Sequence, residues 1–258
     1  MTKNVYWGVH SALGVQATAS VLMVGDSWFW YPVDNLATEL GGMLQNETFV
    51  AIGRTGAEAA DWSQSERKAI DFGFRMFAGS AKVLMLSGGG NDVVGQDDFL
   101  RLIKPDCSQA TTVAECYGPT QPRAIVTGII NAYREVIVRF RAFNPQAPVL
   151  MHNYDNAWPT GRGLFGPADW LKVPMDIAKV PLPLRRDLFK DLLSALHDGQ
   201  VQLAKEPGLG TLVPVQTAGE LPETGVARWW ANELHPTPRG FARIARNRLL
   251  EPLGTALA

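Results

Sequence analysis

Five short runs of apolar residues recur along the chain and predict the strands of a β-sheet. They cover residues 20–25, 48–53, 82–87, 148–153 and 211–215. Each run is nearly continuous in apolar side chains, which is typical of strands that are buried on both faces. Pro214 cannot donate a hydrogen bond to a neighbouring strand, so we expect the last run to lie at an edge of the sheet.

Segments with the spacing of amphipathic helices separate these runs. In the segment before the last run, Leu188, Leu192 and Leu196 recur every four residues and form one apolar face. Strands that alternate with helices predict a parallel sheet with helices on both faces. The predicted fold class is therefore α/β. It has three layers, α/β/α, and the middle layer is a five-stranded, flavodoxin-like parallel sheet. The predicted helices cover residues 33–45, 57–77, 123–143, 184–203 and 236–250.

Two connections are longer than the others and are interpreted as loop insertions in a single domain that spans residues 1–258. They lie near residues 96–122 and 154–183. Long connections in compact domains often carry functional residues. The second is rich in glycine, proline and aromatic residues, and we expect Trp158, Phe165 and Trp170 to form a rim or lid over a site.

The composition narrows the classes of function. The chain has 258 residues, of which 46% are hydrophobic and 19% charged, as expected for a globular domain. Its formal net charge of −1 excludes a strongly basic domain that binds nucleic acid through the phosphate backbone. No apolar run approaches the roughly 18 residues of a membrane span. A small-molecule substrate is therefore the expected partner.

The N-terminal residues and the cysteines bear on the compartment. The first 19 residues resemble a signal peptide only weakly, because Gly8, His10 and Gly14 interrupt the apolar part. We therefore expect a cytoplasmic protein. Cys107 and Cys116 lie in a polar stretch and are interpreted as free thiols. The alternative, a disulfide that closes this loop, would favour export.

Polar and glycine residues stand where the predicted strands end and before the last helix. These motifs are Gly25-Asp26-Ser27-Trp28, Gly53-Arg54-Thr55-Gly56, Gly88-Gly89-Gly90-Asn91-Asp92 and Asn232-Glu233-Leu234-His235. Because the carboxyl ends of parallel strands meet at one edge of a sheet, we expect these residues to converge. A hydroxyl, an imidazole, a carboxamide and backbone amides are the groups that acyl transfer requires.

In order and position, these four motifs resemble those of the SGNH hydrolases, the GDSL-like esterases and lipases. The resemblance extends from Gly25 to His235 and implies the three-layer fold already predicted. It implies that Ser27 is the nucleophile and His235 the general base. The oxyanion donors would then be the amides of Ser27 and Gly56 and the side chain of Asn91.

Each of these residues also has a purely structural explanation. Ser27 could be an ordinary helix N-cap, Gly56 a turn before a helix and Asn91 a stabiliser of its own loop. Gly53 is an alternative to Gly56 as the oxyanion glycine. Asp26 and Asp92 are expected to organise their turns rather than to act chemically.

One position departs from the family pattern. The motif before the last helix usually reads Asp-x-x-His, but Asn232 stands three residues before His235. An asparagine oxygen can accept a hydrogen bond from the imidazole but contributes no charge. We favour Asn232 as the orienting residue, with Glu233 and a main-chain carbonyl near Trp229 or Trp230 as alternatives.

The sequence thus predicts a serine ester hydrolase that works through an acyl-enzyme. Trp28 and Trp230 flank the nucleophile and the histidine and are predicted to bind substrate. No histidine or cysteine spacing fits a metal site, so neither metal nor cofactor is expected. A carbohydrate O-deacetylase or a thioesterase could use the same residues. The alternative from another class is a binding module without catalytic activity.

Overall fold

A parallel β-sheet forms the centre of the computed structural model, which describes residues 4–119, 122–164 and 166–258. In this described part of the chain the sheet has six strands in the order β1-β3-β2-β4-β5-β6, and every neighbouring pair is parallel. The strands are β1 (Val5–Trp7), β2 (Val21–Gly25), β3 (Phe49–Gly53), β4 (Val83–Ser87), β5 (Val149–His152) and β6 (Leu212–Val215).

The five predicted strands are confirmed within one or two residues at each end, and the fold class is confirmed. The predicted number of strands was wrong, because β1 adds a sixth strand beside β3. β1 has only three residues, of which Val5 alone is buried, so it lacks the apolar run that identified the others. β6 is an edge strand, as Pro214 predicted.

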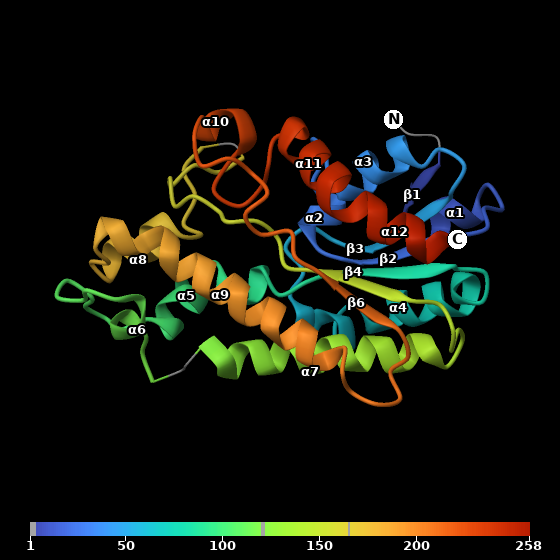
Figure 1. The fold of residues 1–258 in the computed structure, drawn as a ribbon, viewed down its shortest axis with the longest axis horizontal. Coiled ribbons are helices and arrows are strands. Elements are labelled where there is room, and N and C mark those ends of the chain that lie inside the picture. The colour runs from blue at the N-terminus through green and yellow to red at the C-terminus, as the bar shows by residue number, and fades with distance from the viewer. Residues whose placement is uncertain (1–3, 120–121, 165) are drawn as a thin grey trace.

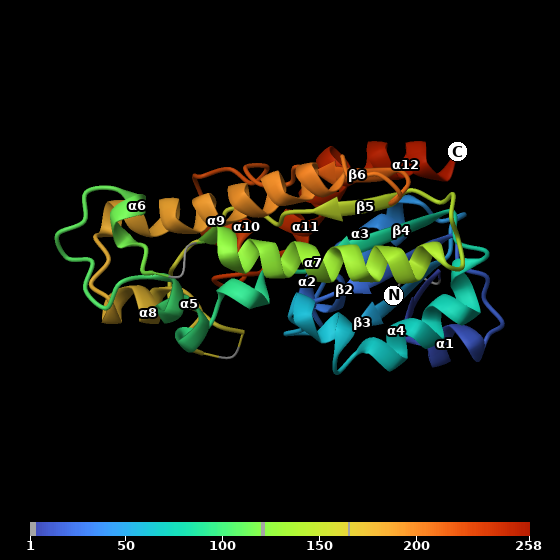
Figure 2. The same ribbon diagram turned by 90° about the horizontal axis from the view of Figure 1, so that it is seen from below.

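Helices cover both faces of the sheet (Figure 1). One layer contains α3, α11 and α12, and the other contains α4, α7 and α9, which Figure 2 shows from below. The helices are α1 (Val9–Leu13), α2 (Ser27–Trp30), α3 (Leu36–Met43), α4 (Arg67–Gly73), α5 (Gln96–Leu102), α6 (Val113–Cys116), α7 (Pro122–Arg141), α8 (Lys172–Ile177), α9 (Leu182–Leu203), α10 (Val226–Trp229), α11 (Pro238–Ile244) and α12 (Leu250–Leu257). Short 3₁₀ segments lie at Ala59–Ser63 and Asn91–Val93, and π-helical turns lie at Phe74–Ala78 and Ala245–Leu249. None of the described helices is long and apolar enough to cross a membrane.

The two long connections contain more regular structure than the sequence predicted. The first includes α5 and α6, and the second includes α8. α5 packs against α8, and α6 packs against α9. These helices extend beyond the edge of the sheet at which β2 and β4 end (Figure 1). The two connections therefore form one packed extension of the fold.

The sequence singled out two cysteines and several aromatic residues in these connections, and the structure describes most of them. Cys107 and Cys116 are buried free thiols, and the Cys107 Sγ lies 3.5 Å from the main-chain oxygen of Cys116. The main-chain oxygen of Trp170 accepts a hydrogen bond from Gly95 N at 3.0 Å, which joins the second connection to the loop after β4. Phe165, predicted to be part of the rim, lies outside the described residues.

The ends of β2 and β3 approach each other closely, and this explains one of the two candidate glycines. Gly53 has φ +138°, and a Cβ atom there would lie 1.9 Å from the main-chain oxygen of Gly25. Packing alone therefore requires glycine at residue 53. Gly56 has φ +77°, which favours glycine, but the space around the position of a Cβ atom is open. Contact with neighbouring atoms therefore does not require glycine at residue 56.

Candidate active site

Ser27 lies at the turn from a central strand into a short helix. β2 ends at Gly25, and Asp26 caps α2 by accepting a hydrogen bond from Trp28 N at 3.0 Å. Ser27 is the first residue of α2, so its own amide falls outside the helical hydrogen-bond pattern. Within the described part of the chain this amide has no acceptor. The turn thus presents a side-chain hydroxyl and a free main-chain donor side by side.

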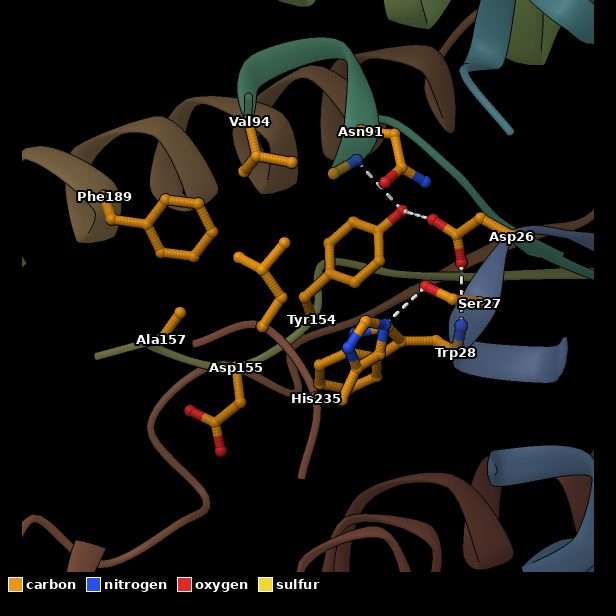
Figure 3. A pocket seen from close by; sticks show the side chains of 12 residues that line it. Asp26, Ser27, Trp28, Asn91, Val94, Tyr154, Asp155, Ala157, Phe189 and His235 are labelled. Atoms are coloured by element: carbon orange, nitrogen blue, oxygen red, sulfur yellow. Dashed lines mark hydrogen bonds between the residues drawn. The ribbon is translucent and has the colours of Figure 1, made fainter. Parts of the chain in front are cut away.

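His235 and Ser27, which are 208 residues apart in the sequence, form a hydrogen bond. The distance from His235 Nε2 to Ser27 Oγ is 2.7 Å (Figure 3). Both side chains are buried, with 6% and 5% of their surface exposed. This is the geometry in which an imidazole can remove the proton of a serine hydroxyl.

Asn232 holds the other nitrogen of the His235 ring. Its Oδ1 lies 3.1 Å from His235 Nδ1 and also accepts from the main-chain N–H groups of Leu234 at 2.9 Å and His235 at 2.8 Å. Main-chain N–H groups only donate, so the atom of Asn232 that they contact must be the oxygen. The oxygen in turn requires a proton on Nδ1. The Nε2 atom is therefore unprotonated in the neutral ring and able to accept from Ser27.

Glu233, the first alternative for this role, points elsewhere. Its carboxylate is fully buried and accepts hydrogen bonds from the main-chain N–H groups of Gly161 at 2.8 Å, Lys172 at 2.9 Å and Leu171 at 3.1 Å. It therefore anchors the second long connection to the histidine loop. The structure brings Asn232, and not Glu233, to the His235 ring.

The second alternative was a main-chain carbonyl near Trp229 or Trp230. The two ring nitrogens of His235 contact Asn232 Oδ1 and Ser27 Oγ, and the main-chain oxygen of Trp229 accepts from Thr237 N at 2.8 Å instead.

Burial lowers the pKa of His235 to about 3. Burial disfavours the charged ring, and no acidic side chain offsets this effect, so His235 is neutral near pH 7.

The loop after β4 brings Asn91 to the same edge. One N–H of its carboxamide donates to the main-chain oxygen of Ala57 at 2.8 Å. A carboxamide has two such donors, so one remains for a ligand. Asn91 lies in the wall of the same cleft as Ser27 (Figure 3). Asn91 therefore stabilises the loop that contains Ala57 and also lies in the wall of the cleft.

Gly56 lies on the loop that Asn91 holds. Thr55 Oγ1 donates to the main-chain oxygen of Trp30 at 3.1 Å, so the loop is attached to α2 on one side and to Asn91 on the other. Gly56 is exposed, and its amide has no acceptor in the described part of the chain. It is not among the residues that line the cleft with Ser27.

Tyr154 is a residue of the site that the sequence analysis did not identify. Its hydroxyl donates to Asp26 Oδ2 at 2.6 Å and accepts from Gly90 N at 3.0 Å (Figure 3). Tyr154 lies two residues after the end of β5, and this position near a strand end is the signal that could have revealed it. It links the cap of the nucleophile turn to the loop that carries Asn91.

Asp26 is fully enclosed beneath the nucleophile. Its carboxylate accepts from Tyr154, from Ser87 Oγ at 2.9 Å and from Trp28 N. Burial nevertheless raises the pKa of Asp26 to about 6, since the three hydrogen bonds offset only part of the cost of burying the charge. Asp92 accepts from Ala59 N at 2.9 Å. Both aspartates therefore organise turns, as the sequence suggested.

A narrow cleft with a volume of about 20 Å³ opens beside Ser27. Figure 3 shows Val94, Ala157 and Phe189 on the side of the cleft away from Ser27. Trp28 lies in the wall of this cleft. Trp230, which was also predicted to bind substrate, is buried and does not line the cleft. The cleft is lined by Asp26, Ser27, Trp28, Gly90, Asn91, Val94, Tyr154, Asp155, Ala157, Phe189, Leu234 and His235.

Main-chain N–H groups surround the carboxylate of Asp155 in the wall of the cleft. Asp155 accepts from the main-chain N–H groups of Asn156, Gly219 and Leu221 at 2.6–2.7 Å. In the described residues, no group of three or more histidine, cysteine, aspartate or glutamate side chains is placed to hold a metal ion.

Solved structures with the same fold are GDSL/SGNH-like esterases and lipases. A carbohydrate esterase of family 3 from Talaromyces cellulolyticus matches with TM-score 0.54 and 12% identity over 93% of this chain and 98% of its own. An extracellular lipase from Streptomyces rimosus matches with TM-score 0.54 and 14% identity, covering 93% and 100% of the two chains. A phospholipase A1 from Streptomyces albidoflavus NA297 matches with TM-score 0.52 and 16% identity, with the same coverage.

No model of a protein family matches the sequence, and no curated protein does. The likeness to the solved structures therefore concerns the fold, which is the fold of the SGNH hydrolases. The fold expected from the motifs is confirmed.

Proposed function

We propose that the protein is a serine hydrolase that cleaves carboxylic esters through an acyl-enzyme intermediate. The observation that carries this proposal is the hydrogen-bonded series Ser27–His235–Asn232, with distances of 2.7 Å and 3.1 Å. The names of the structural neighbours, which include an esterase, a lipase and a phospholipase, support ester hydrolysis as the class of reaction.

In the first half of the reaction, Ser27 is acylated. His235 Nε2 takes the Ser27 proton while Oγ forms a bond to the ester carbonyl carbon. The carbonyl oxygen becomes an oxyanion, for which the donors are the amide of Ser27 and the free N–H of Asn91. The family resemblance implies the amide of Gly56 as a third donor, although Gly56 does not line the cleft. His235 then gives its proton to the leaving alcohol as the carbon–oxygen bond breaks. The acyl group remains on Ser27.

In the second half, water releases the acid. His235 takes a proton from water, whose oxygen attacks the acyl carbon, and the same donors stabilise the second oxyanion. The bond between the acyl carbon and Ser27 Oγ then breaks as His235 returns the proton to Oγ, so that the carboxylic acid leaves and the free enzyme is restored. This cycle needs no cofactor, because every proton that His235 accepts is returned within the same half-reaction.

The cleft favours a short acyl group. Its volume of about 20 Å³ is little more than a single water molecule needs and far below that of a site for a large ligand. Val94, Ala157 and Phe189 give its far end an apolar wall, which suits a hydrocarbon group rather than a charged one. Acetyl or propionyl esters are therefore preferred to long-chain esters in this proposal.

Two other functions use the same residues. A carbohydrate O-deacetylase also fits a small acyl pocket, and one structural neighbour is a carbohydrate esterase. A thioesterase would differ only in the leaving group. A binding module without catalytic activity is the alternative from a different class, and the absence of a carboxylate at Asn232 is the feature that favours it.

A panel of esters tests the proposal. We expect the protein to hydrolyse p-nitrophenyl acetate faster than the butyrate and octanoate esters, and a sugar acetate and an acetyl thioester identify the leaving group. Ser194, an exposed serine on α9, provides the control, since Ser194→Ala should keep full activity while Ser27→Ala loses it. Absence of hydrolysis for every ester and thioester by the folded protein would favour the binding module.

A further inference from the structure

The ring of Tyr31 lies flat against the imidazole of His235. The ring centroids are 4.1 Å apart, and the angle between the planes is 8°. Tyr31 is the C-cap residue that directly follows α2, four positions after Ser27, and only 4% of its surface is exposed. The same short helix therefore presents the nucleophile and a ring stacked on the general base.

The hydroxyl of Tyr31 is bonded to the other end of the same unit. Asn232 Nδ2 donates to the Tyr31 hydroxyl oxygen at 3.0 Å. A carboxamide can rotate to exchange its oxygen and nitrogen, and a partner that accepts from the nitrogen opposes this rotation. Tyr31 thus holds the oxygen of Asn232 toward His235 Nδ1.

The general base, His235, has no carboxylate partner among the described residues to stabilise its charged form. His235 becomes a cation each time it takes a proton, and in a triad with aspartate the carboxylate stabilises that cation. Asn232 supplies a dipole but no charge. His235 is also buried, which raises the free energy of its charged form.

The carboxylates on the elements around His235 are bound by other hydrogen-bond donors and do not contact the imidazole. Glu233 on its own loop is bound to three main-chain N–H groups, and Asp155 beyond β5 is bound to three others. Asp26 at the start of α2 is held by Tyr154, Ser87 and Trp28. The remaining titratable groups are Ser27, Tyr154 and, on the loop paired with the histidine loop, Arg162.

The aromatic neighbours of His235 differ in distance and angle. The Trp170 ring lies 6.0 Å from the imidazole at an angle of 81°, whereas the Tyr31 ring lies parallel to it at 4.1 Å and presents its face. The face of an aromatic ring carries negative electrostatic potential and attracts a cation within about 6 Å of the centroid. Tyr31 satisfies this condition.

We propose that Tyr31 is a positioning residue that compensates for the missing carboxylate, because its ring face stabilises the His235 cation and its hydroxyl fixes the orientation of Asn232. This inference rests on the proposed esterase function, since it assigns a role within that reaction. A tyrosine also remains compatible with aspartate at residue 232, because its hydroxyl can donate to the carboxylate.

Two substitutions separate the contributions of the ring and the hydroxyl. Tyr31→Phe keeps the ring and removes the acceptor for Asn232, whereas Tyr31→Leu removes both. Phe241→Leu is the control, since Phe241 packs against Tyr31 at 6.4 Å but does not stack on His235. Thermal unfolding of each variant establishes that it is folded at the assay temperature.

Titration of His235 by NMR of histidine-labelled protein is the primary measurement. It is made in the Asn232→Asp background, where the carboxylate brings the titration to a higher and more accessible pH. We expect Tyr31→Leu to lower the pKa of His235 by about one unit, and Phe241→Leu and Tyr31→Phe to change it little. An unchanged pKa in folded Tyr31→Leu protein overturns the inference.

Kinetics give a second measurement of the same inference. We expect Tyr31→Leu to reduce kcat about tenfold with little change in KM, and Asn232→Asp to restore most of that loss. A loss that Asn232→Asp does not restore would mean that Tyr31 acts only through packing. If the wild-type protein hydrolyses no ester, the proposed function fails, whereas the titration still decides whether Tyr31 stabilises the cation.

Discussion

The side-chain oxygen of Asn232 lies 3.1 Å from Nδ1 of His235, in the place where an aspartate would contribute a negative charge. The contact sets the tautomer of the ring without adding charge, and burial lowers the pKa of His235 to about 3. The base is therefore neutral over a wide range of pH. This combination gives the site a pH dependence that can be measured.

The first prediction concerns Asn232→Asp. The rate should rise with pH as His235 loses its proton, since only the neutral ring can accept from Ser27. A carboxylate beside Nδ1 stabilises the protonated ring and raises the pKa of His235. We therefore expect the variant to stay active and the acidic limb of kcat/KM to move to higher pH than in the wild type. A limb that does not move would remove Asn232 from the mechanism.

Asn232→Ala and Glu233→Ala distinguish the two neighbouring residues. Asn232→Ala removes the acceptor of the Nδ1 proton and should lower kcat/KM by about 10²-fold or more. Glu233→Ala frees three main-chain donors and should lower the melting temperature, but the acidic limb should keep its position. If Glu233→Ala moves the limb and Asn232→Ala does not, Glu233 orients the histidine.

The second prediction concerns Asn91 as an oxyanion donor. Because its free N–H would bind the oxyanion more strongly than the ester carbonyl, Asn91→Ala should lower kcat by about 10²–10³ with little change in KM. Asn91→Asp, which keeps the size of the side chain but loses its donors, should show a similar loss. An increase in KM alone would mean that Asn91 binds substrate or only supports its loop.

The third prediction concerns the buried carboxyl of Asp26, whose pKa is raised to about 6 by burial. An aspartate in the unfolded chain titrates near 3.9, so the folded state binds more protons between about pH 4 and pH 6. The contribution of this group to stability is therefore present below about pH 4 and is lost as the pH rises through 6.

Asp26→Asn removes this titration. The free energy of unfolding of the variant, minus that of the wild type, should increase by about 2–3 kcal/mol between pH 4 and pH 6.5. Urea unfolding at a series of pH values measures the difference, and the other titrating groups cancel because both proteins contain them. A constant difference would show that Asp26 is not buried as a high-pKa acid.

The fourth prediction concerns the link between Asp26 and Gly90. Tyr154→Phe leaves Asp26 Oδ2 and Gly90 N without this partner and should cost about 1–3 kcal/mol of stability. We also expect kcat to fall by roughly tenfold, because the loop of Asn91 loses its attachment to the nucleophile turn.

Tyr117→Phe is a matched control for this variant. Tyr117 donates to Asp191 Oδ2 at 2.7 Å, which is the same kind of bond between a phenol and a carboxylate. It belongs to the packed extension of the fold and does not line the cleft. Its loss should leave kcat unchanged, and equal effects of the two substitutions on kcat would contradict the role assigned to Tyr154.

Long apolar runs made most of the sheet predictable, whereas the short strand was not. β2 to β5 each contain four or five residues of which at most one is not buried, and β6 has two buried residues of four. The chemistry of Ser27, Asn91 and His235 follows from their positions at strand ends and before a helix. β1 has a single buried residue and becomes a strand only because β3 offers it a partner.

Contacts between distant aromatic residues could not be predicted from local pattern. Tyr31 is 204 positions from His235, and Tyr154 is 128 positions from Asp26, so no spacing rule connects them. The same applies to the two tryptophans, since Trp28 lines the cleft while Trp230 is buried away from it. Adjacency to a catalytic residue in the sequence does not determine which way a side chain faces.

The central claim is that Ser27 is a nucleophile activated by His235, and covalent labelling with an organophosphonate ester followed by mass spectrometry tests it most directly. We expect one adduct per chain on the peptide that contains Ser27, no adduct in Ser27→Ala, and much slower labelling in His235→Ala. A folded wild-type protein that takes up no label, or takes it up equally well after Ser27→Ala, would contradict the claim.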